Sequence, residues 1–308
     1  MNHKVILISD PGIDGAFAVT LAMHDPNLEV LGLLATAGNV DAVQATKNIQ
    51  VVIEQVDPPR WPRLGAAPQV EYEIDGKRFH GPEGLGGGSF ASATLHHLPH
   101  SEKLLVELVR KHPQEVTVIC MGPMTVLTRA FDLYAELATM VKRLVCVGGT
   151  LREPGNAGPV SEFHFSCDPL AARTVVRCGA PITLIPLDVM RKMLFSPSDL
   201  LGLPADTSKA CRFLRQIVPF GIAASSNLYG VEGCALQDVL GIVAVTLPEA
   251  LGTRPMLVDV ETRGELTRGM SVFDERPWKT GLANVDLAVE VDGRLVRGYI
   301  ERVLKLKA

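Results

Sequence analysis

Short apolar runs alternate along this chain with longer segments in which apolar residues recur every three or four positions. The short runs cover residues 5–8, 28–36, 116–122, 143–149 and 182–187. The longer segments have the spacing of amphipathic helices, and they cover 14–24, 40–56, 101–112, 124–140 and 168–178. Strands that are apolar throughout lie in parallel sheets covered on both faces. The pattern predicts a doubly wound, mostly parallel, Rossmann-like α/β sheet.

The second half of the chain departs from this alternation. Its pattern predicts helices at about 197–224 and 236–247, a strand pair near 256–273, and a last strand and helix over 285–306. No linker, repeat or low-complexity tract marks a boundary. We therefore expect residues 1–308 to form one domain with helical additions in its C-terminal half.

Composition narrows the class of protein. The chain has 308 residues, is 47% apolar and carries a net charge of −4, with acids and bases interspersed, so no basic stripe predicts nucleic-acid binding. Six scattered cysteines without a C-x-x-C pair favour a reducing compartment. The N-terminal apolar run is too short for a signal peptide, and no run approaches membrane-spanning length. We expect a cytoplasmic protein without a membrane partner.

Polar residues follow the predicted strands, where open α/β sheets bind their ligands. This set is rich in oxygen atoms and consists of Asp10, Asp14, Asn39, Asn156, Glu162 and Asp238. Such side chains suit calcium or magnesium, and also hydroxyl-rich ligands such as sugars. Taken alone, Asp10 and Asp14 would better suit a turn and a helix N-cap. The gathering of similar residues at other strand ends favours a binding site.

Other motifs are less informative. The glycine-rich stretch 80–89 lacks the Lys-Ser/Thr ending of a P-loop, so we interpret it as a mobile surface loop that could act as a lid. His96, His97 and His100 could bind a transition metal, although Pro99 interrupts their spacing and favours a solvated loop that ends in an N-cap at Ser101. The chain has no G-x-S-x-G or H-E-x-x-H motif.

The order and spacing of several motifs resemble those of the inosine-uridine nucleoside hydrolase family. The first motif, Ile8 to Ala16, lies over the family's D-x-D-P-G-x-D-D-A. The later matches are A-G-N-V at 37–40, H-G-P-E-G-L-G at 80–86, G-P-M-T at 122–125, G-N at 155–156, S-E-F-H at 161–164, D-P at 168–169, L-D-V at 187–189, Q-D at 237–238 and E-L-T-R-G-M at 265–270. The match extends over nearly the whole chain.

The resemblance implies hydrolysis of the N-glycosidic bond of ribonucleosides by a homodimer or homotetramer. It implies calcium held by Asp10, the Thr125 carbonyl and Asp238, with Asp10 accepting the proton of the attacking water and Asp14 holding a ribose hydroxyl. The remaining residues implied to bind substrate are Asn39, His80, Asn156, Glu162, Phe163, His164 and Gln237. Tyr229 could cover the base, an expectation from its position in the chain alone.

Several positions depart from the family motif. Ile8 replaces its first aspartate, Gly15 a calcium aspartate, Val126 and His164 asparagines, and Gln237 a histidine. Because calcium affinity follows the number of charged ligands, Gly15 predicts weakened or absent calcium binding. One hypothesis is an N-ribosidase with weakened calcium binding or altered specificity. A second is a pseudoenzyme that binds nucleoside or ribose without hydrolysis, and a third is a transition metal recruited by His164.

Overall fold

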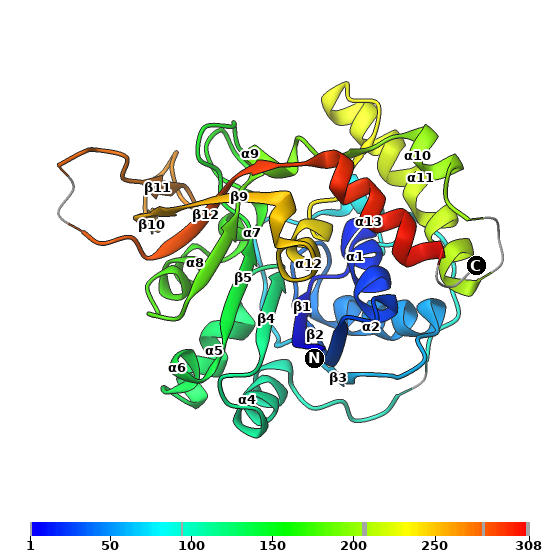
Figure 1. Cartoon of the computed structure of the whole chain (residues 1–308), viewed down its shortest axis with the longest axis horizontal. Coiled ribbons are helices and arrows are strands. Elements are labelled where there is room, and N and C mark those ends of the chain that lie inside the picture. Colours follow the sequence, from blue (N-terminus) through cyan, green and yellow to red (C-terminus); the bar gives the residue numbers. More distant parts are fainter. Residues whose placement is uncertain (1, 94, 205–207, 279–280, 306–308) are drawn as a thin grey trace.

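One eight-stranded sheet forms the centre of the molecule (Figure 1). The computed structural model describes residues 2–93, 95–204, 208–278 and 281–305. In sheet order the strands are β3 (Arg63–Gly65), β2 (Leu28–Ala35), β1 (His3–Ser9), β4 (Thr117–Met121), β5 (Arg143–Val147), β6 (Ile182–Ile185), β12 (Val285–Val291) and β9 (Leu251–Met256). All neighbouring pairs in this sheet are parallel except β12 with β9. The prediction of a doubly wound, mostly parallel sheet is confirmed.

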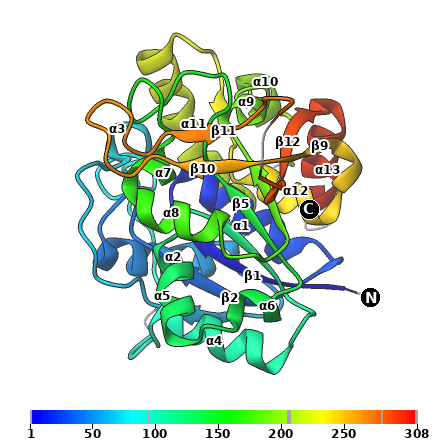
Figure 2. The same cartoon turned by 90° about the vertical axis from the view of Figure 1, so that its left-hand side faces the viewer.

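Helices cover both faces of the sheet, as Figures 1 and 2 show. One face carries α1 (Ile13–His24), α2 (Ala42–Val56), α11 (Lys209–Tyr229), α12 (Val239–Thr246) and α13 (Gly293–Lys305). The other carries α4 (Ser101–Lys111), α5 (Thr125–Leu133), α6 (Leu137–Met140) and α8 (Pro169–Val176). The shorter elements are α3 (Lys77–His80), α7 (Phe163–Cys167), α9 (Leu187–Met190), α10 (Pro197–Leu201) and the 3-10 turn Pro248–Ala250.

Two small hairpins lie outside the main sheet. The first pairs β7 (Leu194–Phe195) with β8 (Cys234–Ala235). The second pairs β10 (Val258–Val260) with β11 (Ser271–Phe273), which confirms the predicted strand pair. This second hairpin and its loops extend away from the sheet on the left of Figure 1, and we call residues 258–278 and 281–284 the arm.

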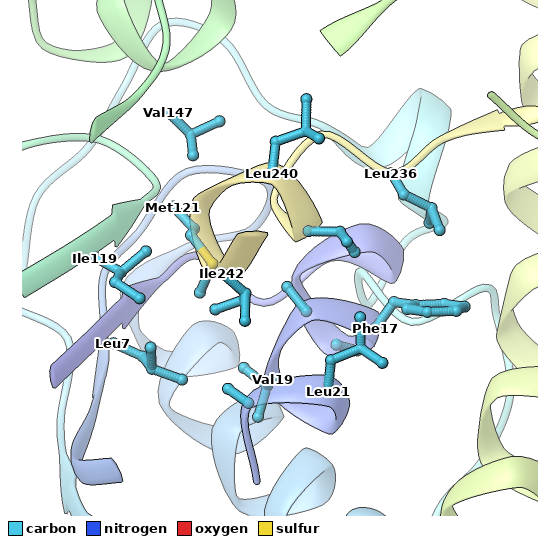
Figure 3. Close-up of a cluster of buried hydrophobic side chains, with 14 of the residues drawn as sticks. Leu7, Phe17, Val19, Leu21, Ile119, Met121, Val147, Leu236, Leu240 and Ile242 are labelled. Atoms are coloured by element: carbon cyan, nitrogen blue, oxygen red, sulfur yellow. The ribbon is translucent and has the colours of Figure 1, made fainter. Parts of the chain in front are cut away.

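The α1 side of the core explains why the first helix is so well fixed. Figure 3 shows side chains of the sheet, including Leu7, Ile119 and Met121, gathered around Ile242 of α12, while Phe17 of α1 lies on the other side of the cluster beside Leu236. All twelve residues of α1 are buried. A helix that is apolar on every side is packed between other elements rather than on a surface. The start of α1, which carries Asp14 and Gly15, is therefore held rigidly beside the end of β1.

Two predicted helices are wrong in their continuity. The segment 124–140 splits into α5 and α6, because Tyr134 adopts an extended backbone. The segment 197–224 splits into α10 and α11, because Pro204 follows α10 closely and cannot continue it. The helix α11 then starts after Ser208, whose hydroxyl accepts the Cys211 N–H, and extends past the predicted end to Tyr229. No described helix is both long enough and apolar enough to cross a membrane.

The glycine-rich stretch and the three histidines differ in how far they are exposed to solvent. Leu85 is buried, and Asn48 Nδ2 donates to the Glu83 carbonyl at 2.7 Å, so the middle of the glycine-rich stretch is packed against the molecule, whereas Gly87, Gly88 and Ser89 are exposed. His96, His97 and His100 are exposed and lie outside helices and strands, as expected for a solvated loop. Ser101 is not the N-cap, since its hydroxyl donates to the Ala35 carbonyl instead.

Candidate functional site

Most of the predicted site residues line one cavity of about 740 Å³ beyond the carboxyl ends of the strands. They are Asp14, Asn39, His80, Asn156, Glu162, Phe163, His164, Gln237 and Asp238. The order of the sheet reverses between β1 and β4, and ligands bind outside such a switch point. Asp10 lies at this point, fully buried beneath the cavity. Thr125 does not line the cavity, and its contacts lie to one side.

One carboxylate oxygen of Asp10 is held by a hydrogen bond, and the other is without a hydrogen-bond partner among the described residues. Asn39 donates its backbone N–H to Asp10 Oδ2 at 3.0 Å, and its side-chain amide donates to the Asp10 carbonyl at 2.8 Å. Asp10 Oδ1 has no hydrogen-bond partner in the described chain and lies 3.8 Å from His164 Nε2. Burial raises the pKa of the Asp10 carboxyl to about 7, although the neighbouring His164 lowers it. Oδ1 is therefore the oxygen that can accept a proton.

The start of α1 is not capped by either aspartate. Its N-cap residue is Gly12, which has no side chain to accept the helix N–H groups. Asp14 lies in the first turn with its side chain directed to the cavity, and its Oδ1 is 3.9 Å from His80 Nε2. The simple reading of Asp10 and Asp14 as turn and cap residues is therefore wrong.

The two histidines of the cavity are held in opposite ways. His80 Nδ1 accepts the Ile13 backbone N–H at 3.0 Å, which requires an unprotonated Nδ1. Burial also lowers the pKa of His80, although Asp14 opposes this. His164 Nδ1 lies 2.9 Å from the Val147 carbonyl, to which it can only donate. Burial lowers the pKa of His164, but Glu162 and Asp10 outweigh it and the net shift is upward. His80 is thus a neutral Nε2–H donor, whereas His164 can carry a charge.

Glu162 and Asn156 are fixed by backbone groups. Glu162 accepts the N–H groups of Gly149, His164 and Phe165 at 3.0 to 3.1 Å, so its carboxylate caps α7 and ties it to the end of β5. Asn156 Oδ1 accepts the Phe163 N–H at 2.8 Å, which leaves its amide N–H groups free to donate. Both side chains reach the cavity wall in a single orientation.

The residues beside Gly15 partly fit a cation. Asp238 is buried, its Oδ1 is without a hydrogen-bond partner in the described chain, and burial together with Asp14 and Asp10 raises its pKa well above the usual range. Buried carboxylate oxygens without partners are stabilised by a positive ion. No group of three or more Asp, Glu, His or Cys is arranged to hold a metal among the described residues, and Gly15 adds no ligand. The donor set therefore fits a cation held by two carboxylates rather than three.

Thr125 uses its side chain away from the cavity. Its hydroxyl lies 2.7 Å from the Tyr72 hydroxyl and donates to Asp168 Oδ2 at 2.6 Å. Its backbone carbonyl accepts the Thr128 hydroxyl at 3.0 Å. Sequence reasoning missed Tyr72 because it lies in a loop without a motif or periodicity.

Tyr229, which the sequence placed near the base by its position in the chain, lines the cavity and forms an aromatic pair with Phe79, with ring centroids 6.5 Å apart. Residues that the sequence did not indicate also line or shape the cavity, and they include Phe79, Leu187 and Arg191. Asp188 accepts the N–H groups of Leu151 and Arg152 at 2.8 and 2.9 Å, and so shapes the loop that carries Asn156. The L-D-V motif marked Asp188 without indicating this role.

Comparisons with known proteins agree with this geometry. A family model described as inosine-uridine preferring nucleoside hydrolase matches residues 5–297. The chain is 30% identical to the probable uridine nucleosidase 2 of Oryza sativa subsp. japonica, over 98% of this chain and 93% of that protein. It is 29% identical to the non-specific ribonucleoside hydrolase RihC of Escherichia coli O1:K1 / APEC, over 99% of both.

Two solved structures extend the likeness to three dimensions. A plant nucleoside hydrolase, the PpNRh1 enzyme, superposes with a TM-score of 0.89 at 26% identity, over 99% of both chains. A purine-preferring ribonucleoside hydrolase from Gardnerella vaginalis superposes with a TM-score of 0.89 at 25% identity, again over 99% of both chains. With its polar cavity at the switch point of the same sheet, this chain belongs to the inosine-uridine preferring nucleoside hydrolase family.

Proposed function

We propose that this chain hydrolyses the N-glycosidic bond of ribonucleosides, with Asp10 as the group that accepts the proton of the attacking water. The carrying observation is Asp10 Oδ1, which is buried and without a hydrogen-bond partner among the described residues, while Asn39 holds Oδ2. A general base needs one free oxygen in a fixed position. The reaction class itself follows from membership of the family.

The sugar would bind to the side chains around the switch point. Asp14 and Glu162 offer carboxylate oxygens, Asn156 offers amide N–H groups, and Asn39 and His164 lie beside Asp10. Polar groups whose own orientation is locked are suited to hold hydroxyls in one geometry. As the glycosidic bond breaks, the sugar gains positive charge, which the nearby carboxylates stabilise.

The base would bind at the other end of the cavity. Phe163 walls the sugar side, and Phe79 and Tyr229 offer aromatic surfaces for the base. His80 donates through Nε2–H, and the Gln237 amide can donate as well. Neither is a strong acid, so these residues would stabilise the departing base by hydrogen bonds rather than by full proton transfer.

Calcium binding belongs to the same proposal, in a weakened form. Asp10 and Asp238 would hold the ion, with the Thr125 carbonyl as the third group implied by the family motif, and Gly15 contributes nothing. When bound, such a cation orients sugar hydroxyls and lowers the pKa of a coordinated water. Affinity follows the number of charged ligands, so we expect binding weaker than with three carboxylates.

The test is a panel of purine and pyrimidine ribonucleosides assayed with added calcium and with chelator. We expect release of free base and ribose, with a rate that rises with calcium concentration. Binding of nucleosides by calorimetry without turnover of any would instead establish the pseudoenzyme. Turnover that chelator leaves unchanged would refute the assignment of Asp10 and Asp238 to a metal.

We also propose a homodimer or homotetramer in the cytoplasm, with no nucleic-acid or membrane partner. Apolar side chains on the arm support association, since Leu266, Trp278 and Leu282 are 80%, 73% and 89% exposed. The six free cysteines, five of them buried, support a reducing compartment. The site residues come from loops and helices spread over residues 10–238 and meet in one cavity beyond the main sheet, which supports treating 1–308 as one unit.

A further inference from the structure

One wall of the cavity is a short segment between β3 and the glycine-rich stretch. We call residues 74–80 the wall segment; it supplies Phe79 and His80 to the cavity. Two hydrogen bonds hold this segment to the rest of the molecule. Gly76 N–H donates to the Asn39 carbonyl at 3.1 Å, and His80 accepts the Ile13 N–H at 3.0 Å.

The near end of the wall segment is held through Tyr72. The Tyr72 hydroxyl contacts Thr125 Oγ1 at 2.7 Å, and Thr125 Oγ1 contacts Asp168 Oδ2 at 2.6 Å. Asp168 is itself fixed, because its Oδ1 accepts the Ala171 N–H at 3.0 Å at the start of α8. Among the described residues, Tyr72 makes the only side-chain hydrogen bond from residues 70–73. These three side chains therefore join the loop to the helices that follow β4 and β5.

The direction of the hydrogen bonds can be assigned. Asp168 accepts at both carboxylate oxygens, so Thr125 donates its hydroxyl proton to Asp168. Tyr72 is then the donor to Thr125 Oγ1. Burial raises the pKa of the Tyr72 phenol, so the phenol keeps the proton that it donates. A phenylalanine would preserve the ring and remove only this donor.

We propose that Tyr72 is a positioning residue whose hydroxyl fastens the wall segment to Thr125 and Asp168, and so holds Phe79 and His80 where the leaving base binds. The identity of that ligand rests on the proposed function. The anchoring does not, because it follows from the contacts of Tyr72 alone. The other hydrogen bonds named for residues 69–80 that reach the rest of the molecule are those of the Gln69 carbonyl with Arg129, of Gly76 with Asn39 and of His80 with Ile13. With so few tethers, the loss of one lowers the free energy at which the loop opens.

Limited proteolysis tests the anchoring without any assay of activity. Lys77 and Arg78 are exposed in the wall segment and are sites for trypsin. We expect Tyr72→Phe to raise the rate of cleavage there roughly five- to tenfold, as loss of one buried neutral hydrogen bond predicts. Tyr134→Phe is the matched control, since it removes a tyrosine hydroxyl bound to Glu136 on the surface, and should leave that rate unchanged.

Variants of Thr125 test whether the hydrogen bonds from Tyr72 to Thr125 and from Thr125 to Asp168 act together as one anchor. Thr125→Val should accelerate cleavage as Tyr72→Phe does, Thr125→Ser should not, and the double variant should be no faster than either single one. Unchanged cleavage in Tyr72→Phe would overturn the proposal. Equal acceleration at tryptic sites throughout the protein would also overturn it, because that indicates general loosening of the fold.

Steady-state kinetics test whether the Tyr72 anchor affects the binding of a nucleoside. For a nucleoside that the wild type hydrolyses, Tyr72→Phe should raise KM about five- to tenfold and leave kcat within about twofold, the signature of lost uniform binding. Faster cleavage with an unchanged KM would overturn the positioning role. Absence of turnover in the wild type would count against the proposed function only, since proteolysis still decides the anchoring.

Discussion

Asp10 presents one free oxygen to the cavity, and the substitution Asp10→Asn tests its role directly. The asparagine keeps an oxygen for the Asn39 N–H but cannot take a proton from water. We expect kcat to fall about 10²- to 10⁴-fold with little change in thermal stability. Asp132→Asn, an exposed position on α5, is the control and should retain full activity. A kcat near that of the wild type in Asp10→Asn would remove Asp10 from this role.

Gly15 is the departure with the clearest physical consequence. A Cβ at this position would lie 3.0 Å from Ser9 Oγ and 3.1 Å from Asp238 Oδ2, so a side chain fits only if these neighbours shift slightly. We expect Gly15→Asp to lower the melting temperature in chelator, through crowding and added negative charge, and to tighten calcium binding about tenfold or more in calorimetry. Gly15→Ala adds a Cβ without a carboxylate, so its melting temperature shows the effect of crowding alone. Equal calcium affinity in the wild type and Gly15→Asp would contradict the account of weakened binding.

His80 predicts how stability depends on pH. Its folded-state pKa is lowered by burial, so the unfolded chain binds more protons in acid. The contribution of neutral His80 to stability is therefore complete above the unfolded pKa of about 6.5 and is lost as the pH falls below it. His80→Asn offers an acceptor for the Ile13 N–H without titrating. Urea unfolding from pH 7.5 to 5 should show a smaller loss of free energy of unfolding in this variant, and an equal loss would refute the assignment.

At the scale of elements, the loop 150–156 depends on a residue of α9. Asp188 accepts backbone N–H groups of Leu151 and Arg152, and the same loop carries Asn156 into the cavity. We expect Asp188→Ala to raise KM for nucleosides about tenfold, because the sugar-facing Asn156 loses its fixed position. The same Asp132→Asn control applies. Unchanged KM would show that Glu162 and Phe163 hold the loop without Asp188.

The helices and strands also show which parts of the fold the local sequence pattern can predict. The strands over residues 5–8 and 116–122 were predictable because each is a nearly continuous apolar run. The last strand and helix were predictable for another reason, since their apolar residues recur at strand and helix spacing. The break at Tyr134 within 124–140 was not, since apolar residues continue at helical spacing through it. Short strands such as β7 and β8 have two residues each and carry no periodicity to detect.

At the scale of the whole molecule, the arm is the feature that bears on assembly. Its exposed apolar side chains predict a particle larger than one chain in light scattering. The double substitution Leu266→Glu with Leu282→Glu should shift that mass towards the monomer by placing charge in the contact. Lys305→Glu, a charge change at the end of α13 away from the arm, should leave the mass unchanged. A wild type that is monomeric would refute the proposed oligomer.

The sequence by itself determined the order of strands and helices and the polar residues at the strand ends, because hydrophobic periodicity and the parallel sheet place those residues at one edge. Only the tertiary structure decided what each group can do. The tautomers of His80 and His164 follow from the backbone atoms of Ile13 and Val147, which lie far from them in the chain. The free oxygen of Asp10 and the anchor at Tyr72 depend likewise on distant partners, Asn39 and Thr125, since hydrogen bonds are set by proximity in space and not by spacing in sequence.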